Sequence, residues 1–417
     1  MGTRNIIACL SCIGFLIISG CSGRKPSYSF DGKISEEVLN NYLDRSVTMA
    51  ELLTVDPFCI DDSYPHKEVD LDFIRRSGVK FIGRAIYRWG HEQAFNDPAW
   101  LENAGKLASE IHGIDPDIIL QACVFEAVYK KGFNQIHIPS WTFDALGLEP
   151  EDRNFDFDRL LFPDGRYVDF WGHDSCVPDI RQTETQLWFM FLIGTYVRLG
   201  VESFHLGQVM LIGAEDEGWK TYDSFLAKVR KYAERYARRH YVLFDSHAGP
   251  RGMLSEDGRS LLDFNAFPLR IKEVRDEPEH GVLEVGYLDA LFCKCPGGIT
   301  PSGWSCKSLP YLVEFDNFGI SKHPGEAADD HFVWGFDEIS WFYRQPVEYK
   351  REFLRYAWDW VKKTDPAGHL QMPSSRVVTL PAPGRRQIVC RVVPPSEDIP
   401  YGMDIDSTII DIWNSDK

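Results

Sequence analysis

Short apolar segments alternate with amphipathic segments along most of this chain of 417 residues. The apolar segments are rich in β-branched and aromatic residues, which is typical of strands. The strand candidates are 47–53, 79–87, 117–127, 203–211, 241–247, 261–269, 310–317 and 335–342. The segments between them carry apolar side chains at helical spacing, most clearly over 223–240 and 348–363. Strands that alternate with helices predict a parallel sheet with crossover helices, and eight such units predict an α/β protein built as a closed (β/α)8 TIM barrel.

An open, doubly wound sheet is the alternative arrangement of alternating strands and helices. It is disfavoured because the sequence contains no glycine-rich phosphate loop of the kind that often accompanies such a sheet. Two long segments, 130–183 and 270–309, interrupt the alternation, and each follows a strand. Both are therefore expected as insertions at the C-terminal rim of the barrel, where barrels of this kind build their sites.

The predicted barrel spans residues 41–371, and a linker over 21–40 precedes it. The last residues, 372–417, contain the strand-like stretches VVTLPAP and RQIVCRVVPP. A segment of this length is short for an independent domain, so it is expected as a short C-terminal β-rich extension packed on the barrel.

The N-terminus has the pattern of a secretory signal peptide. Arg4 precedes an apolar run over 6–18 that is too short to span a membrane comfortably. The sequence Ile-Ser-Gly-Cys that ends at Cys21 resembles a bacterial lipobox, in which the cysteine becomes the lipidated first residue of the mature protein. The resemblance implies a signal peptide over 1–20 and a lipid anchor in the cell envelope, and Ser22 favours the outer membrane, facing the periplasm. The alternative is an ordinary signal peptide followed by a cysteine by chance.

The charge balance excludes one class of partner. The chain carries 45 Lys and Arg residues against 62 Asp and Glu residues, a formal net charge of −17. Nucleic-acid binding needs a basic surface to neutralise phosphates, so a nucleic-acid partner is not expected.

Seven cysteines follow Cys21, and an odd number leaves at least one free thiol unless a bond forms to another chain. Cys293, Cys295 and Cys306 lie close together in the sequence. They are expected to be free thiols or to form one local disulfide, because a zinc site would need a fourth ligand.

Polar side chains gather where the predicted strands end. This set comprises Glu51, Arg84, Glu126, His205, Gln208, Asp245, His247, Asp263, Asn265, Glu314, Asp316 and Asp337. Buried charges are costly unless they are paired or used, so a single such residue would signify little. Nearly every strand contributes one, which favours a functional site at the C-terminal rim over a purely structural set of ion pairs.

The segment PYLVEFDNFG carries two of these carboxylates on one strand. Side chains alternate along a strand, so Glu314 and Asp316 point to the same side. Here the chain resembles TIM-barrel glycoside hydrolases that keep a carboxylate nucleophile at the end of strand seven, with Glu314 of YLVEFDN at that position and the aromatic segment WGFDEISWF after it. The resemblance covers about residues 45–370 at the level of architecture, and it implies hydrolysis of a glycosidic bond without a cofactor.

Such hydrolysis needs a second carboxyl group that protonates the leaving oxygen. The family usually places an Asn-Glu pair at strand four, whereas this chain has HLGQVMLIGAEDE there, with Gln208 where an acid would stand. Glu126, after the apolar run CVF, is the first candidate for the acid, Glu215 the second and Asp245 the third. An ion pair with Arg84 from the neighbouring strand is the alternative role for Glu126.

Sugars bind to flat apolar surfaces and to a few placed hydrogen-bonding groups. The residues predicted to bind substrate are Arg84, Gln208, Asp245, His247, Asn265, Asp316, Asp337, Trp171, Trp304 and Trp341. Trp171 in DFWGHD and Trp304 in PSGWSC lie in polar, glycine-containing segments, which favours binding over burial. The expected partner is an oligo- or polysaccharide.

Two other functions fit the same residues. A lipid-anchored protein that binds a glycan without hydrolysing it is favoured by the missing Asn-Glu pair. A metal-dependent barrel hydrolase would take its ligands from His205, Asp245, His247 and Asp337. The sequence has no His-x-His or HExxH motif, so no metal is expected.

Overall fold

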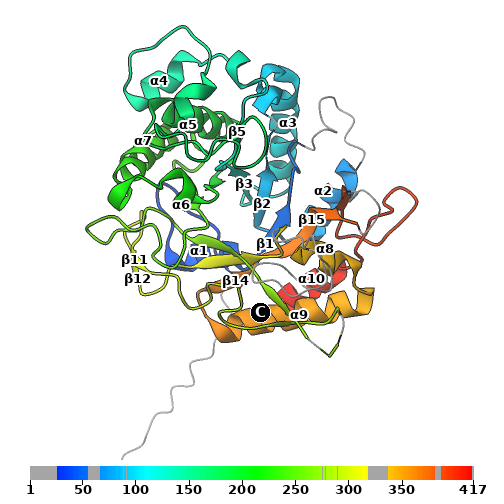
Figure 1. The fold of residues 1–417 in the computed structure, drawn as a ribbon. Helices are drawn as coiled ribbons and strands as arrows, with labels where there is room; N and C mark the ends of the chain where they lie inside the picture. The colour runs from blue at the N-terminus through cyan, green and yellow to red at the C-terminus, as the bar shows by residue number, and fades with distance from the viewer. Residues whose placement is uncertain are drawn as a thin grey trace, which may run out of the picture.

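The computed structural model describes most of the chain after the N-terminal segment (Figure 1). The described residues are 26–54, 66–87, 89–90, 92–274, 276–277, 279–288, 290–317, 337–380 and 387–415. The predicted signal peptide and Cys21 lie outside these ranges. Among the described residues, no helix is long and apolar enough to cross a membrane.

Seven strands form the main sheet in the order β16-β15-β1-β2-β3-β6-β7. They are β1 (Ser46–Met49), β2 (Phe81–Ile86), β3 (Ile119–Cys123), β6 (Ser203–His205), β7 (Leu243–Asp245), β15 (Met372–Thr379) and β16 (Gln387–Cys390). All neighbours pair in parallel except β15 and β16, which are antiparallel. Consecutive parallel strands need a crossover connection, so the predicted alternation of strands and helices is confirmed for this part of the chain.

A second, three-stranded parallel sheet has the order β14-β13-β8. Its strands are β8 (Asn265–Pro268), β13 (Tyr311–Glu314) and β14 (Gly368–Leu370). At one edge, β14 runs into β15 of the main sheet through Gln371. At the other edge, the Ala266 N–H donates to the Ser246 carbonyl just beyond β7, at 3.2 Å. The sheets adjoin at both edges, but their strand pairs do not join into one closed ladder, so the predicted closed barrel is observed as two adjoining parallel sheets.

The helices fall between the strands, as crossover connections require. They are α1 (Glu36–Leu43), α2 (Lys67–Ser77), α3 (Pro98–Ile114), α4 (Ser140–Leu146), α5 (Thr183–Arg198), α6 (Val209–Ile212), α7 (Lys220–Tyr236), α8 (Glu338–Arg344), α9 (Val347–Thr364) and α10 (Asp406–Ser415). Figure 1 shows α4, α5 and α7 on one side of the strands and α8, α9 and α10 on the other. The helices predicted over 223–240 and 348–363 correspond to α7 and α9, and the apolar stripe of α7 is buried from Phe225 to Ala233.

The long segments after β3 and β8 contain short antiparallel hairpins. These strands are β4 (Val128–Tyr129), β5 (Ser175–Cys176), β9 (Ile271–Glu273), β10 (Gly281–Leu283), β11 (Gly298–Ile299) and β12 (Ser305–Cys306). Single 3₁₀ turns lie at Glu92–Asn96, Phe133–Gln135, Phe157–Leu160 and Glu217–Trp219. The cysteines predicted to be free or locally paired, Cys293, Cys295 and Cys306, are free thiols.

The prediction of a strand over 335–342 is wrong. Its described residues begin α8, and the Asp337 carboxylate caps that helix by accepting from the Ser340 N–H at 2.7 Å. An Asp residue can begin a helix because its carboxylate accepts a hydrogen bond from a backbone N–H of the first turn. The aromatic segment after it has the composition of a strand as well, so the sequence alone does not distinguish the two. The strand that pairs with β1 is instead β15, although residues from 372 onward were expected in a peripheral extension.

Helix α1 closes the N-terminal end of the strands. Its buried side chains, including Leu39 and Tyr42, form one apolar cluster with Phe81, Ile119 and Leu243, which are the first residues of β2, β3 and β7. Residues 36–40, expected in a linker, are therefore part of the packed floor. Helix α1 therefore leaves the opposite, C-terminal end of the strands uncovered.

We predict that Leu39→Ala lowers the free energy of unfolding by about 2–5 kcal/mol, because it leaves a cavity in place of a fully buried side chain. Urea unfolding followed by circular dichroism measures the change. Leu148→Ala is the control, since Leu148 is an exposed leucine and should lose far less. Equal losses in the two variants would contradict the packing of α1 against the strands.

Candidate functional site

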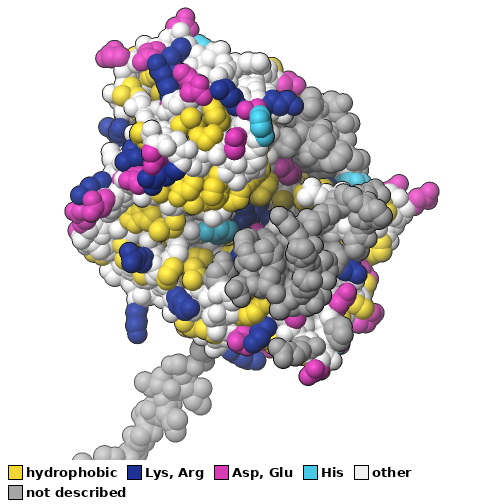
Figure 2. Space-filling model, in the orientation of Figure 1, with side chains coloured by type: hydrophobic (Ala, Val, Ile, Leu, Met, Phe, Trp, Pro, Cys, Tyr) yellow, Lys and Arg dark blue, Asp and Glu magenta, His cyan; other side chains and the backbone are white. Residues whose placement is uncertain are grey.

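A cavity of about 1150 Å³ lies at the C-terminal ends of the strands. Figure 2 shows hydrophobic side chains gathered in a band across the middle of this face. The strand ends contribute Glu51, Arg84, Tyr87, Phe125, Glu126, His205, Gln208, His247, Pro268, Asp316 and Arg376 to its lining. Residues from nearly every central strand thus meet in one place, as the sequence predicted.

The backbone is strained at three points of the cavity wall. Glu51, Arg84 and Arg270 have φ angles of 65°, 58° and 54°, in the left-handed region that non-glycine residues rarely adopt. At Arg84, the backbone N–H donates to the Gln121 side chain instead of continuing the β2–β3 ladder, at 3.1 Å. Such conformations cost free energy and concentrate at functional sites, so they mark the cavity independently of its shape.

Glu314 is held in a buried ion pair. Arg84 donates to both of its carboxylate oxygens, through Nε at 2.9 Å and through Nη2. Arg376 lies 3.7 Å away on the other side. Burial by itself would raise the pKa of Glu314, but the two arginines outweigh it and lower that pKa to about 2. Glu314 is not among the residues that line the cavity, although residues that bind it, Arg84 and Arg376, do line it.

Glu126 has a different environment although it is equally buried, at 2% exposure. Its two oxygens accept from the backbone N–H and the side-chain amide of Gln208, each at 2.9 Å. Burial raises the pKa of Glu126, and these hydrogen bonds offset the rise only in part. Arg84 binds Glu314 and not Glu126, so the alternative of a Glu126–Arg84 ion pair is not observed.

Gly207 explains how Gln208 comes so close to the Glu126 carboxyl. Gly207 has φ +61°, and a Cβ at this position would lie 2.0 Å from Glu126 Oε2. Only glycine satisfies both the turn and the close approach. The segment that lacks the expected Asn-Glu pair therefore holds the Glu126 carboxyl, which follows β3.

Two further carboxyl groups line the cavity. Asp316 lies 3.6 Å from Arg376 in an ion pair. Asp337, at the start of α8, is 1% exposed. Burial raises the pKa of Asp337 to about 6; the Ser340 hydrogen bonds oppose the shift and the charge of Asp316 adds to it. Asp316 and Asp337 are therefore neighbours within one electrostatic cluster.

A neutral histidine pair forms another part of the wall. His205 Nδ1 lies 2.7 Å from Asp245 Oδ2, and Gln121 donates to the other Asp245 oxygen at 2.7 Å. Burial lowers the pKa of both His205 and His247 to about 3, so neither imidazole is charged at neutral pH. Asp245 is fully buried behind His205 and does not line the cavity. In the described part of the chain, no three His, Cys, Asp or Glu side chains are grouped so that they could hold a metal ion.

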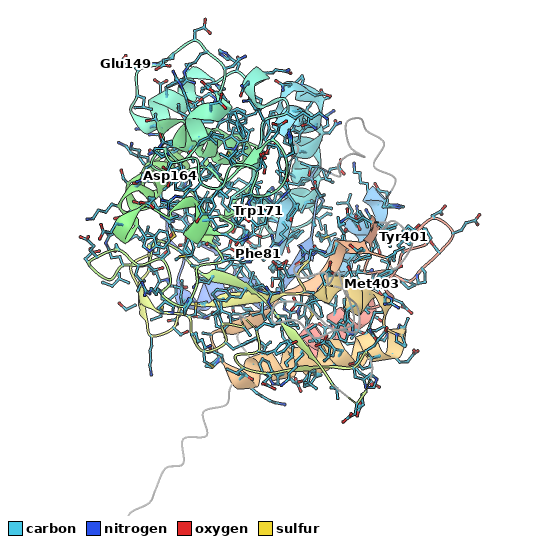
Figure 3. All side chains as sticks on the ribbon, in the orientation of Figure 1. Phe81, Glu149, Asp164, Trp171, Tyr401 and Met403 are labelled. Atoms are coloured by element: carbon cyan, nitrogen blue, oxygen red, sulfur yellow. The ribbon has the colours of Figure 1, made fainter. Side chains whose placement is uncertain are left out.

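Trp171 is the one predicted tryptophan that reaches the cavity. Its indole N–H donates to the Glu126 carbonyl at 3.2 Å, and its ring contacts that of Trp89 edge to face at 5.0 Å. Figure 3 shows Trp171 near the middle of the molecule, above Phe81 of the floor. Trp171, from the long segment after β3, thus lines the same cavity as Glu126 and binds the Glu126 backbone.

The other two predicted tryptophans lie elsewhere. The Trp304 indole donates to the Ile34 carbonyl and packs against the floor cluster, at the opposite end of the strands. Trp341 is 1% exposed in α8 and donates to the Glu279 carbonyl. Both were expected to contact substrate, and neither lines this cavity.

Two predicted polar residues are also outside the cavity lining. Glu215 is 40% exposed at its side chain and pairs with Arg166 at 2.5 Å. Asn265 donates to the Cys295 sulfur at 2.5 Å from within β8. The structure therefore does not bring Glu215 or Asn265 to the cavity.

Sequence reasoning missed three arginines that line the cavity, Arg270, Arg376 and Arg391. Arg270 follows β8 directly, so its position at a strand end was a usable signal. Arg376 lies within β15, whose place in the main sheet depends on pairing with β1, more than 300 residues earlier in the chain.

Comparisons with known proteins give only distant matches. No family model and no curated protein matches the chain. Among solved structures, a GH27 β-L-arabinopyranosidase from Geobacillus stearothermophilus is 13% identical over 79% of this chain and 73% of its own, with a TM-score of 0.38. A γ-CGTase from alkalophilic Bacillus clarkii is 9% identical over 89% and 56%, with a TM-score of 0.43. An isomalto-dextranase from Arthrobacter globiformis T6 is 10% identical over 79% and 53%, with a TM-score of 0.34. Likenesses this weak support no argument about function.

We predict that Glu314→Gln lowers the free energy of unfolding by about 3–5 kcal/mol, because it leaves Arg84 charged and buried without its partner. The stabilisation from Glu314 is present above its ordinary pKa of 4.5 and is lost as the pH falls toward about 2, so the gap between variant and wild type should narrow in acid. Urea unfolding at several pH values measures both effects. Glu215→Gln breaks an exposed pair and is the control, and a comparable loss there would contradict the structural role of Glu314.

For Asp337 we predict the opposite pH dependence of the free energy of unfolding. Its pKa is about 6 in the folded protein against an ordinary 3.8, so the folded state binds the proton more tightly than the unfolded state. The free energy of unfolding should therefore fall by up to about 3 kcal/mol as the pH rises through this interval. Asp337→Asn keeps a helix-capping side chain but does not titrate, so urea unfolding should show a flatter profile. Equal slopes in variant and wild type would refute the assignment.

Proposed function

We propose that the protein hydrolyses a glycosidic bond in a glycan bound in the cavity, with Glu126 as the proton donor. The observation that supports this most is a buried carboxyl group with a raised pKa on the wall of a large cavity that Trp171 also lines. A general acid must hold its proton near neutral pH, and burial is the usual means of achieving this in glycosidases.

The hydrogen bonds of Glu126 leave its proton available. A protonated carboxyl group has three acceptor lone pairs and one O–H donor. Gln208 occupies two of the acceptor positions, through its backbone N–H and its amide. The O–H can then point into the cavity, and Gln208 fixes the plane of the carboxyl group without consuming the proton.

Asp316 is the proposed second carboxylate, which stabilises the developing positive charge on the sugar or activates water. It follows β13, and Glu126 follows β3. These strands lie four positions apart whichever way the strand order is followed through the two sheets. Glu126 and Asp316 both line the cavity and follow strands from opposite parts of this order, which supports their assignment as acid and partner.

Glu314 has a positioning role in this proposal. By binding Arg84 in a fork, it fixes a guanidinium group at the cavity wall and keeps a second arginine, Arg376, between itself and Asp316. Arg84 and Arg376 can then donate to sugar hydroxyl groups or to a charged substituent. The neutral imidazole of His247 adds a further hydrogen-bonding group.

The finer architecture and the location belong to the same proposal. We infer that the two sheets act as one (β/α)8 barrel, a view supported by the continuous run from β14 into β15 and by the Ser246–Ala266 hydrogen bond. Lipid attachment at Cys21 and residence in the cell envelope rest on the sequence of the first residues alone.

Glycan binding without hydrolysis is the second candidate function. One observation favours it: the carboxylate in the position of the expected nucleophile, Glu314, is engaged by Arg84 on both oxygens. The same cavity would then hold a sugar chain without cleaving it. The two functions differ in turnover and not in affinity, so kinetics on a Glu126 variant separates them.

We predict that Glu126→Gln lowers turnover by about 10²–10⁴-fold while glycan affinity changes little, because the amide keeps the shape but cannot donate the proton. The measurement is steady-state kinetics on the glycosides of a broad panel that the wild type cleaves. The Gln208 amide can turn over to face the new amide, so folding should be preserved. A wild-type alkaline limb with a pKa above the ordinary 4.5 of glutamic acid should disappear in the variant.

A second substrate distinguishes the role of Glu126 from that of Asp316. A dinitrophenyl glycoside has a leaving group that needs no protonation, so it should restore much of the activity of Glu126→Gln but not of Asp316→Asn. Unchanged turnover in Glu126→Gln would reject it as the acid. Glycan binding by the wild type without turnover of any panel member would favour the binding function.

A further inference from the structure

We infer that the substrate is an extended oligosaccharide whose chain leaves the cavity across an apolar rim formed by Phe170, Trp171 and Met210. This inference rests on the proposed function, since it names the class of glycan for the same site. It predicts a preference for long chains over short glycosides, with Phe170 and Met210 as specificity-determining residues outside the cavity floor.

The rim exposes large apolar side chains that the fold does not need. Phe170 and Met210 are each 48% exposed, whereas most aromatic and aliphatic side chains of the described residues are buried. Met210 and Trp171 also line the cavity, and the Phe170 ring lies 4.8 Å from that of Trp171. The exposed surface is therefore continuous with the cavity.

A series of edge-to-face ring contacts connects the rim to the proposed acid. Phe170 contacts Trp171, Trp171 contacts Trp89 at 5.0 Å, and Trp89 contacts Phe125 at 5.2 Å. Phe125 directly precedes Glu126. Each edge-to-face contact covers one face of only one of the two rings, so other faces stay available to a ligand, and sugar rings bind to aromatic faces through their C–H groups.

The loop that presents Phe170 is held by its own hydrogen bonds. The Asp169 N–H donates to the Ser175 carbonyl at 2.8 Å, and the Trp171 N–H donates to the Ser175 hydroxyl at 3.0 Å. Asp169 and Asp174 have positive φ angles of 56° and 63°. An ordered, strained loop that holds an aromatic ring in solvent is typical of a binding surface.

A glycan fits this surface better than a second copy of the chain does. The exposed side chains of Asp169, His173 and Asp174 flank Phe170 in the sequence and can bind hydroxyl groups at the edge of a stacked sugar. The cavity, at about 1150 Å³, is larger than the roughly 300–1,000 Å³ typical of sites for single small ligands. A net charge of −17 opposes association between copies.

The test compares Phe170→Ser with Tyr236→Ser. Tyr236 is also an exposed aromatic residue that packs on one neighbouring ring, but it lies on α7 and does not line the cavity. The probes are native gels cast with soluble dextran, pullulan, xylan or arabinogalactan, followed by kinetics on di- to hexasaccharides of the polysaccharide that retards the wild type. Met210→Gln is a second rim variant, used in case Phe170→Ser fails to fold by circular dichroism.

The rim variants should reduce retardation and raise KM for the hexasaccharide roughly three- to tenfold more than for the disaccharide, whereas Tyr236→Ser should match the wild type. Equal effects on short and long chains would overturn the inference but leave the proposed function intact if Glu126→Gln still abolishes turnover. A wild-type dimer that dissociates in Phe170→Ser would also overturn it. No retardation and no hydrolysis in any gel or assay would contradict both proposals.

Discussion

The buried ion pair between Arg84 and Glu314 joins the two halves of this protein. Arg84 belongs to β2 of the seven-stranded sheet, and Glu314 ends β13 of the three-stranded sheet. Arg376, on β15 of the larger sheet, approaches the same carboxylate from another strand. The two sheets have few backbone hydrogen bonds between them where β7 meets β8. The paired, charge-assisted hydrogen bonds from Arg84 to Glu314 therefore help to fix the strand ends that surround the cavity.

The same ion pair divides the carboxyl groups of the cavity into two kinds. Two arginines keep Glu314 ionised in spite of its burial, and Arg376 extends the pairing to Asp316. Glu126 is as buried as Glu314 but has only neutral hydrogen-bond donors from Gln208, so burial dominates and its pKa rises. Carboxyl groups pushed in opposite directions by their surroundings are the means by which one site supplies both an acid and a charged partner. The proposed hydrolysis follows from this difference between Glu126 and Glu314. Asp316, two residues after Glu314, takes the role of nucleophile or base that the sequence assigned to Glu314.

The sequence predicted features that depend on local pattern. Seven of the eight strand candidates contain strands of the parallel sheets, and eight of the twelve polar residues predicted at their ends meet at one cavity because parallel strands share one C-terminal edge. Features set by distant pairing were not predictable in the same way. Strand β15 is recognised by its register with β1. Helix α8 was mistaken for a strand because its aromatic residues after the Asp cap are spaced as they would be in a strand. Trp304 and Trp341 show the limit clearly, since Trp304 packs against the floor and Trp341 in the core instead of lining the cavity.

The central claim is that the Glu126 carboxyl group is protonated more readily than an ordinary glutamic acid and that the Glu314 carboxyl group stays ionised. A ¹³C NMR titration of the protein labelled at the glutamate side-chain carboxyl carbon tests this claim most directly. The two resonances are assigned by their loss in Glu126→Gln and in the Glu314→Leu, Arg84→Met double variant, which removes the buried pair together. The account predicts that the Glu126 carboxyl titrates above 4.5 and that the Glu314 carboxyl stays ionised until the pH approaches about 2. A Glu126 resonance that titrates below 4.5, or a Glu314 resonance that titrates above it, would contradict the account.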